Sequence, residues 1–256
     1  MNIQSIKAYT DNYIWLIETN EGNLVIDPGD SAPVEEFLEN NNLSLTNILL
    51  THHHFDHTGG VKNLKDSLSG KIYGPHSEYI EDIDILVKHG DMVNTLGLQF
   101  EVLEIPGHTL DHIAYFLNAP DQPALFCGDT LFSAGCGRVF EGTYPQMYES
   151  LMKLKSLPAK TLVYCAHEYT LSNLMFAKEV EPDNQDIKNH IFTCRQKLDS
   201  QKPSLPSTLE TELLVNPFLR CDQKELRQAV SGHFEVTSDT PDEVIFEQLR
   251  VWKDTF

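Results

Sequence analysis

The chain has 256 residues, 41% of them hydrophobic, and its formal net charge at neutral pH is −19. A chain of this length and composition can bury a sizeable core, which excludes general disorder. The negative charge repels polyphosphate and no basic stripe overrides it, so nucleic acid is not expected as a partner. No apolar run reaches the roughly 18 to 20 residues of a membrane helix, and the first residues lack a signal-peptide pattern.

The five cysteines are widely spaced and form no CxxC pair. Such a pattern is typical of free thiols in a reducing compartment. We therefore expect a cytoplasmic protein that does not associate with membranes, and we expect it to be a monomer.

The first third of the chain contains a predicted hairpin. Apolar, β-prone residues at 14–17 and 24–26 flank a turn at 21–23, and Asp27-Pro28-Gly29 closes the second strand. Helical patterns follow at 32–40, 60–68 and 145–157, and Thr143 with Gln146 could form a capping box for the last of them. Residues 1–167 are therefore expected to form an α/β domain.

Four segments in this region share one plan, in which a short apolar run ends in a polar residue that could bind metal. Side chains at the ends of neighbouring strands can converge although they lie far apart in the sequence. The runs at 48–50, 100–105, 124–127 and 162–165 lead to His52, His108, Asp129 and His167, respectively.

Beyond His167 the β-prone runs largely stop and helical patterns dominate, at 171–179, 184–198 and 242–253. Residues 204–207 are a candidate linker. Thr240 and Pro241 predict a helix start, with Thr240 as the capping residue and Pro241 at the first helical position. We therefore expect a helical domain over residues 168–256.

A dense histidine cluster lies at the first of these strand ends. In an extended chain His52 and His54 point to the same side, and Asp56 and His57 follow on the turn. Imidazole and carboxylate suit zinc, iron or manganese, and no cysteine lies nearby to indicate a closed structural zinc. A histidine-rich surface loop is the alternative, but three further candidate ligands at distant strand ends favour a metal site.

Seven ligands exceed the needs of one tetrahedral metal and suit two metals that share a carboxylate. The candidate ligands are His52, His54, Asp56, His57, His108, Asp129 and His167. His53 points away from its neighbours and is interpreted as structural. The role of His112 is left open, since it could either pack in the core or support a ligand.

The same residues carry a family resemblance. The chain resembles the metallo-β-lactamase superfamily through His52-x-His54-x-Asp56-His57, Gly107-His108-Thr109, Gly128-Asp129-Thr130 and Cys165-Ala166-His167-Glu168. Within it, the chain is similar to the glyoxalase II family, in which the segments at 132–138, 141–143, 167–170 and 216–218 have counterparts. The resemblance covers essentially the whole chain.

This resemblance implies a four-layer αβ/βα sandwich followed by a helical domain, and hydrolysis of S-D-lactoylglutathione to glutathione and D-lactate in methylglyoxal detoxification. It also implies that one metal takes His52, His54 and His108, that the second takes Asp56, His57 and His167, and that Asp129 bridges them. Zinc is the expected metal, with iron or manganese as alternatives. Asp56 and Asp129 are the ligands to which we assign a catalytic role. The implied glutathione contacts are Arg138, Phe140, Tyr169, Arg250 and Lys253.

Three positions depart from the family pattern. Phe140 stands in place of a tyrosine and lacks one hydroxyl contact to the substrate. Asp111 and Ala166 each replace a glycine near the ligands and could shift the backbone there. None of the three departures removes a metal ligand.

The chemistry expected from two metals is attack of a metal-held hydroxide on a carbonyl carbon. A thioester fits because its thiolate leaves without a strong general acid, and we find no acid candidate beyond the ligands. Arg250 and Lys253, three apart on a predicted helix, could bind an anionic conjugate, although such cations also complement a helix dipole. Cys136, between two glycines, is a less favoured candidate nucleophile.

Other functions are also compatible with these motifs. A lactonase, a nuclease or an iron-dependent glutathione persulfide dioxygenase would share the same superfamily motifs, although the negative charge disfavours the nuclease. A metal-binding protein without catalysis would also use the histidine cluster.

Overall fold

The computed structural model describes residues 1–256 and divides into two compact units. The first unit comprises Met1–Glu104, Asp111–Gly128 and Tyr164–His167, and the second comprises Ile105–Leu110, Asp129–Val163 and Glu168–Phe256. Each unit is therefore discontinuous in sequence. The expected domain boundary between His167 and Glu168 stays a prediction.

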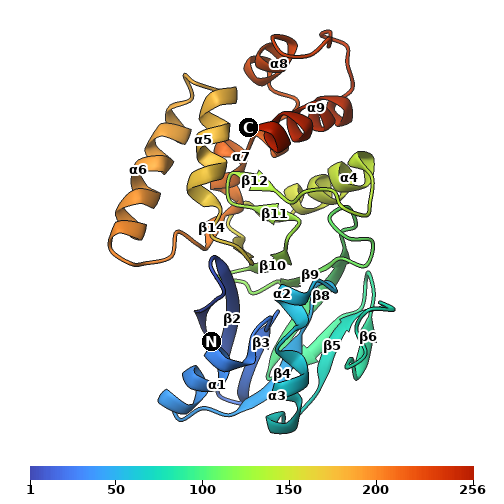
Figure 1. Ribbon diagram of the computed structural model, residues 1–256, viewed down its shortest axis with the longest axis vertical. Coiled ribbons are helices and arrows are strands. Elements are labelled where there is room, and N and C mark those ends of the chain that lie inside the picture. The colour runs from blue at the N-terminus through green and yellow to red at the C-terminus, as the bar shows by residue number, and fades with distance from the viewer. The chain divides into compact units, whose positions relative to one another are not determined.

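A six-stranded mixed sheet begins the first unit, in the order β1-β2-β3-β4-β5-β6 (Figure 1). The pairs β1–β2 and β2–β3 are antiparallel, and the pairs from β3 to β6 are parallel. The strands are β1 (Asn2–Ala8), β2 (Asn12–Thr19), β3 (Gly22–Ile26), β4 (Leu45–Leu49), β5 (Ile72–Pro75) and β6 (Ile85–Val87).

The second sheet of this unit has the strand order β13-β10-β9-β8-β7. The strands β7 to β10 pair in antiparallel fashion. Their bounds are β7 (Met92–Thr95), β8 (Leu98–Glu104), β9 (Ile113–Leu117), β10 (Ala124–Gly128) and β13 (Leu162–Cys165).

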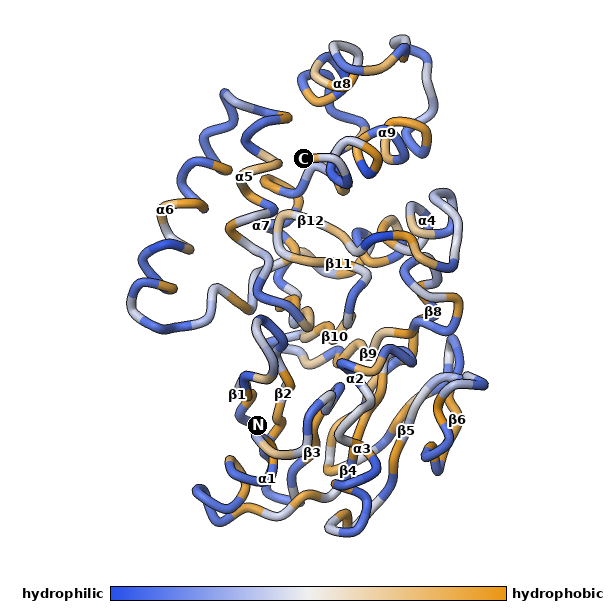
Figure 2. Tube along the Cα trace, in the orientation of Figure 1, coloured by the Kyte–Doolittle hydropathy of each residue, from blue (hydrophilic) through white to orange (hydrophobic).

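Strands such as β2 are buried on both faces, which explains their near-continuous apolar sequence. Ile14 and Leu16 belong to a core cluster that also contains Val34 of α1 (Ser31–Asn40) and Val61 of α3 (Val61–Leu64). Trp15 points the other way, and its ring lies edge-on to Tyr164 with 4.8 Å between centroids. Figure 2 shows hydrophobic residues along these strands and hydrophilic residues at the turns.

The second unit is mainly helical. Its helices α5, α6 and α7 share a core that contains Leu174, Ile187 and Val215, and Phe246 of α9 packs against Tyr148 of α4. The helices are α4 (Tyr144–Lys155), α5 (Thr170–Val180), α6 (Gln185–Asp199), α7 (Leu209–Val215), η2 (Pro217–Leu219), α8 (Lys224–Ser231) and α9 (Asp242–Thr255). The short strands are β11 (Leu131–Phe132), β12 (Gly135–Cys136) and β14 (Ser207–Thr208), of which β14 pairs with the start of β13.

Most of the predicted elements are confirmed. The hairpin is β2–β3, although its strands are longer than expected and its turn falls between Thr19 and Gly22. The helices at 32–40, 145–157, 171–179, 184–198 and 242–253 correspond to α1, α4, α5, α6 and α9. The capping box at α4 is present, because Thr143 accepts from the backbone N–H of Gln146 and the Gln146 side chain accepts from Thr143.

Two local predictions were wrong. The pattern at 60–68 does not form one helix: α3 ends at Leu64 and a 3₁₀ turn, η1 (Lys65–Ser67), follows. The last helix is not capped by Thr240. Pro241 occupies the cap position of α9, and the Thr240 hydroxyl instead accepts a hydrogen bond from the Thr237 N–H, at 2.9 Å.

No helix in the structure is both long enough and apolar enough to cross a membrane. All five cysteines are buried and none forms a disulfide, as the sequence predicted for free thiols.

Candidate metal centre and substrate pocket

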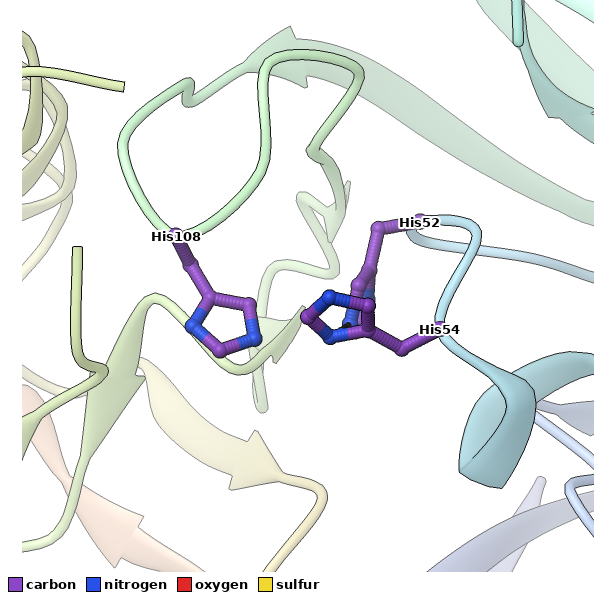
Figure 3. Close-up of side chains that lie close together, drawn as sticks. All are labelled: His52, His54 and His108. Atoms are coloured by element: carbon purple, nitrogen blue, oxygen red, sulfur yellow. Dashed lines mark hydrogen bonds between the residues drawn. The ribbon is translucent and has the colours of Figure 1, made fainter. Parts of the chain in front are cut away.

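The histidine cluster begins where β4 ends in the first unit. Both faces of β4 are buried, so the chain leaves the sheet at a fixed point and carries the fully buried His52 with it. Nε2 of His52 lies 3.2 Å from Nδ1 of His54, and the two rings stand at 73° to each other (Figure 3). Two nitrogens bound to one tetrahedral zinc lie roughly 3.3–3.4 Å apart, so this spacing suits a shared metal.

Asp27, at the end of β3, orients two of the histidines. Its carboxylate accepts from the N–H and the hydroxyl of Thr51, at 2.8 and 2.7 Å, and lies 3.0 Å from Nδ1 of His57. Because the Thr51 hydroxyl donates to Asp27, it accepts from Nδ1 of His52, 3.0 Å away. A histidine whose Nδ1–H is donated in this way presents Nε2 as a metal ligand.

A second ligand group of the first unit consists of Asp56, His57 and His167. His57 and Asp56 lie on the short helix α2 (Phe55–Thr58), and His167 follows β13. Oδ2 of Asp56 lies 3.6 Å from Nε2 of His57 and 3.4 Å from Nε2 of His167. The three ligand atoms all lie within 4.8 Å of one another, so they could surround one ion.

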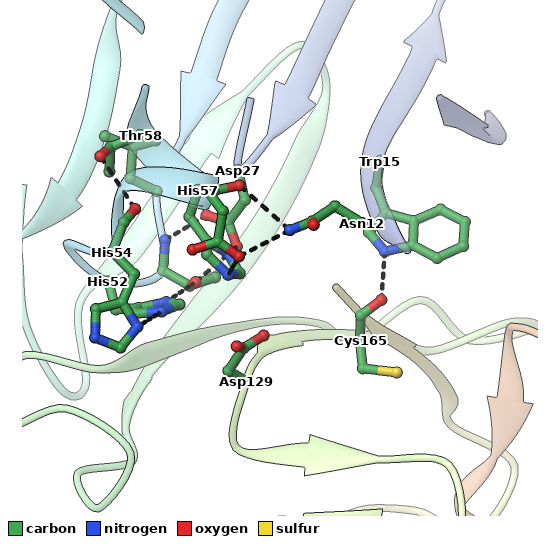
Figure 4. Close-up of polar contacts among 12 residues, drawn as sticks. Asn12, Trp15, Asp27, His52, His54, His57, Thr58, Asp129 and Cys165 are labelled. Atoms are coloured by element: carbon green, nitrogen blue, oxygen red, sulfur yellow. Dashed lines mark hydrogen bonds and ion pairs between the residues drawn. The ribbon is translucent and has the colours of Figure 1, made fainter. Parts of the chain in front are cut away.

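His167 is held by residues from the turn before β2. Its Nδ1 lies 2.8 Å from Oδ1 of Asp11. Asp11 thus contacts Nδ1 of His167 in the same way that Asp27 contacts Nδ1 of His57. Asn12 donates to Oδ2 of Asp56 at 2.9 Å, and Figure 4 shows Asn12 reaching toward this group. The donor set therefore fits a divalent metal, with imidazoles fixed by carboxylates and a carboxylate among them.

His53, interpreted as structural, and His112, whose role was left open, both contact other side chains. Nδ1 of His53 lies 3.0 Å from Asp111, and its ring lies 4.6 Å from that of Tyr79, which agrees with a structural role. Asp111, which departs from the family pattern, therefore contacts the His53 ring nitrogen. His112 is fully buried and stacks on His52 at 4.4 Å, so it packs against a candidate ligand.

The second unit holds two further candidate ligands, His108 and Asp129. Nδ1 of His108 donates to the carbonyl oxygen of Arg138 at 2.8 Å, and Nε2 lies 3.5 Å from Oδ2 of Asp129. Both residues are buried, at 4% and 6% exposure. Gly137 is required here, because a Cβ at this position would lie 1.9 Å from the Asp129 carbonyl oxygen.

Both of these ligands line a cavity of about 560 Å³ that lies within the second unit. The five residues expected to contact glutathione line the same cavity: Arg138, Phe140, Tyr169, Arg250 and Lys253. The structure therefore brings the predicted substrate contacts together with two of the predicted metal ligands.

Among these contacts, Arg250 is the most deeply buried. Its side chain is 4% exposed, and Nη1 donates to the carbonyl oxygen of Cys136 at 2.9 Å. Nη2 donates to Oδ1 of Asp254 at 2.9 Å, and the guanidinium lies over the Phe218 ring at 5.1 Å. Arg250 thus ties α9 to β12 in addition to lining the cavity.

The other two cations are more accessible. Arg138 has a side chain that is 63% exposed, and its Nε lies 3.5 Å from Oδ1 of Asp254. Lys253 lies over the rings of Phe176 and Phe256, at 5.3 and 5.6 Å. Burial, and next the charge of Arg250, lower the pKa of Lys253.

The structure argues against Cys136 as a nucleophile. The thiol is buried, and burial raises its pKa to about 11 although Arg250 lies beside it. A thiol with such a pKa is almost entirely protonated at neutral pH, and only the thiolate is a good nucleophile.

Sequence reasoning missed three carboxylates of these sites: Asp11, Asp27 and Asp254. Asp27 follows the same plan as the predicted ligands, since it is the polar residue at the end of an apolar strand. It was interpreted only as part of a turn. Asp254 lies four residues after Arg250, a spacing that predicts a contact on a helix. We find no sequence signal that would have singled out Asp11.

Two family models match the chain. The metallo-β-lactamase superfamily matches residues 10–167, and the model described as hydroxyacylglutathione hydrolase C-terminus matches residues 168–256. A curated hydroxyacylglutathione hydrolase from Idiomarina loihiensis is 45% identical over 256 residues, which cover 99% of both chains.

Solved structures show the same fold. The BLEG-1 B3 metallo-β-lactamase is 22% identical, with a TM-score of 0.65 over 86% of this chain and 100% of the other. TTHA1623, solved in a di-iron-bound form, is 25% identical, with a TM-score of 0.59 over 86% of this chain and 100% of the other. These matches confirm the α/β fold class that the sequence predicted.

Proposed function

Because the chain belongs to the hydroxyacylglutathione hydrolase family within the metallo-β-lactamase superfamily, we propose that it hydrolyses S-(2-hydroxyacyl)glutathione thioesters. S-D-lactoylglutathione is the chief substrate, and the products are glutathione and D-lactate. This reaction would serve the detoxification of methylglyoxal. The full-length match to curated relatives, at 45% identity, is the observation that carries the proposal.

We further propose that the enzyme uses two divalent metal ions, with zinc as the first choice and iron or manganese as alternatives. One ion would take His52, His54 and His108, the other would take Asp56, His57 and His167, and Asp129 would bridge them. The nitrogen and oxygen separations of 3.2 to 3.6 Å within each unit support this assignment, because they suit ligands of a common ion. A di-iron relative supports the count.

When bound, the two ions supply a water-derived nucleophile at neutral pH and stabilise negative charge on the carbonyl oxygen. The role of the chain is to hold each ligand in one tautomer and one orientation. Asp27 and Asp11 accept from Nδ1 of His57 and His167, which places the Nδ1 proton on the carboxylate side and directs each Nε2 toward the site as the ligand atom. The leaving thiolate needs no general acid, which agrees with the lack of an acid candidate beyond the ligands.

The cavity of the second unit accounts for binding of an anionic conjugate by an acidic protein. Arg138 and Lys253 offer cationic groups to the carboxylates of glutathione, and salt screens the distant negative charges beyond roughly 8 to 10 Å. Tyr169 offers a hydroxyl. Phe140, 63% exposed, offers only its ring.

Hydrolysis of S-D-lactoylglutathione by the purified, metal-loaded protein tests the proposal, with loss of thioester absorbance as the readout. We expect turnover in the ordinary range of enzymes, about 1–10³ per second. Absence of turnover in a sample with full metal content would reject it. Oxygen uptake with glutathione persulfide would then test the dioxygenase alternative.

A further inference from the structure

One carboxylate lies among the three cations of the cavity in the second unit. Arg138, Arg250 and Lys253 line this cavity, and so does Asp254. The formal charge contributed by these four side chains is therefore three positive and one negative. A site meant only to attract anions would gain nothing from the carboxylate, because it weakens the field of its neighbours.

The geometry gives Asp254 a free oxygen. Both guanidinium contacts use Oδ1, with Nη2 of Arg250 at 2.9 Å and Nε of Arg138 at 3.5 Å. The carboxylate thus lies between the two cations, and Oδ2 is available to a ligand. The side chain is 34% exposed, so a ligand in the cavity could reach it.

The charge pattern of glutathione matches this arrangement. At neutral pH a glutathione thioester carries two carboxylates, on its glycine and γ-glutamyl residues, and one ammonium on the γ-glutamyl residue. The two carboxylates call for cations, and the ammonium calls for an anion close to one of them. Other acyl carriers, such as phosphorylated thiols, carry several negative charges and no such ammonium next to a carboxylate.

We propose that Asp254 is a specificity-determining residue that accepts a hydrogen bond from the γ-glutamyl ammonium of the substrate while Arg138 binds the adjacent carboxylate. The inference rests on the proposed function. Asp254 therefore selects a zwitterionic thioester over purely anionic ones, at the cost of some general attraction for anions.

A purely structural role for Asp254 is the competing explanation, because the carboxylate also holds Arg250. The two roles differ in what they do to related ligands. A positioning role affects every ligand that uses the cations in the same proportion. Recognition of the ammonium affects only ligands that carry it.

The test uses two thioesters that differ by one group: S-D-lactoylglutathione and its deamino analogue, in which a glutaryl group replaces γ-glutamyl. In the unchanged protein we expect kcat/KM to favour the first by about 10-fold or more, since a hydrogen bond between charged groups is lost with the second. In Asp254→Asn this preference should fall to about 1. Asp254→Lys should favour the analogue.

Glu179→Gln serves as the control. Glu179 is exposed on α5 and lies outside the cavity lining, and its replacement removes the same formal charge as Asp254→Asn. It should keep the full preference. If Asp254→Asn lowered kcat/KM equally for both thioesters, or lowered neither value, the preference would be unchanged and the inference would be overturned. Calorimetric binding of S-methylglutathione and its deamino form, which cannot be hydrolysed, repeats the comparison without turnover. A lack of hydrolysis therefore rejects the proposed function, and a lack of binding preference rejects the role of Asp254.

Discussion

Nδ1 of His57 lies 3.0 Å from Oδ2 of Asp27, and the two residues are 30 positions apart in the sequence. The carboxylate at the end of β3 thereby fixes which nitrogen of a candidate ligand on α2 carries the proton. Such support raises the basicity of the ligand nitrogen and holds the ring in place.

Asp27→Asn should therefore weaken metal binding by about 10–100-fold. The amide can no longer accept every hydrogen bond that the carboxylate takes from Thr51 and His57. Titration of the loaded protein with a competing chelator measures the effect. Asp121→Asn, on an exposed turn of the same unit, is the control. Equal metal affinity in the two variants would refute the role of Asp27.

Asp129→Ala should abolish hydrolysis and lower the metal content, because it removes the proposed shared ligand. Metal analysis and the thioester assay on one sample check both effects. A variant with intact metal content and near-normal turnover would show that Asp129 does not bridge the two ions.

Arg138 and Arg250 should differ when each is replaced by alanine. Arg138 is largely exposed, so Arg138→Ala should raise KM by about 10-fold and leave the melting temperature nearly unchanged. Arg250 is buried and joins Cys136 to Asp254, so Arg250→Ala should also cost about 3 kcal/mol of stability. Michaelis constants and denaturant unfolding separate the two. Equal stability of both variants would contradict the structural role of Arg250.

Phe140→Tyr should lower KM for S-D-lactoylglutathione by about 2- to 10-fold, the value of one new hydrogen bond. Phe140 lines the cavity and is exposed, so the added hydroxyl needs no repacking. Steady-state kinetics provide the measurement. An unchanged KM would mean that the ring at this position does not reach the substrate.

The affinity for substrate should fall on the alkaline side because of Lys253. Burial and the Arg250 charge lower the pKa of this amine below its usual value of 10.5, so its charge is lost at a lower pH than in an exposed lysine. KM should therefore rise with pH through this range. The arginine in Lys253→Arg keeps its charge at every pH in this range. If KM rose equally in that variant, Lys253 would not be the group that titrates.

Much of the candidate site could be predicted because metal chemistry leaves a local signature. Apolar strands that end in His52, His108, Asp129 or His167 are visible in the sequence, and the structure brings ligand sets together within each unit. Asp27 ends a strand in the same way, yet the Pro28-Gly29 pair made it look like a turn. The contact between Asp11 and His167 spans 156 positions, so no local pattern could reveal it.

The fold was predictable where periodicity was strong and less so elsewhere. The long helices α4, α5, α6 and α9 carry clear patterns, whereas α7 and α8 are short and were missed. At α9 the Thr240-Pro241 pair suggested a side-chain cap, but Thr240 bonds to Thr237 and Pro241 takes the cap position. The monomeric state and the cytoplasmic location stay predictions.

Stepwise addition of zinc to the metal-free protein, with thioester hydrolysis followed at each step, tests whether hydrolysis depends on two bound ions. We expect activity toward S-D-lactoylglutathione to rise until two ions are bound per chain and then to level off. Full activity with one ion bound would contradict the two-metal site. No hydrolysis with two ions bound would contradict the proposed reaction.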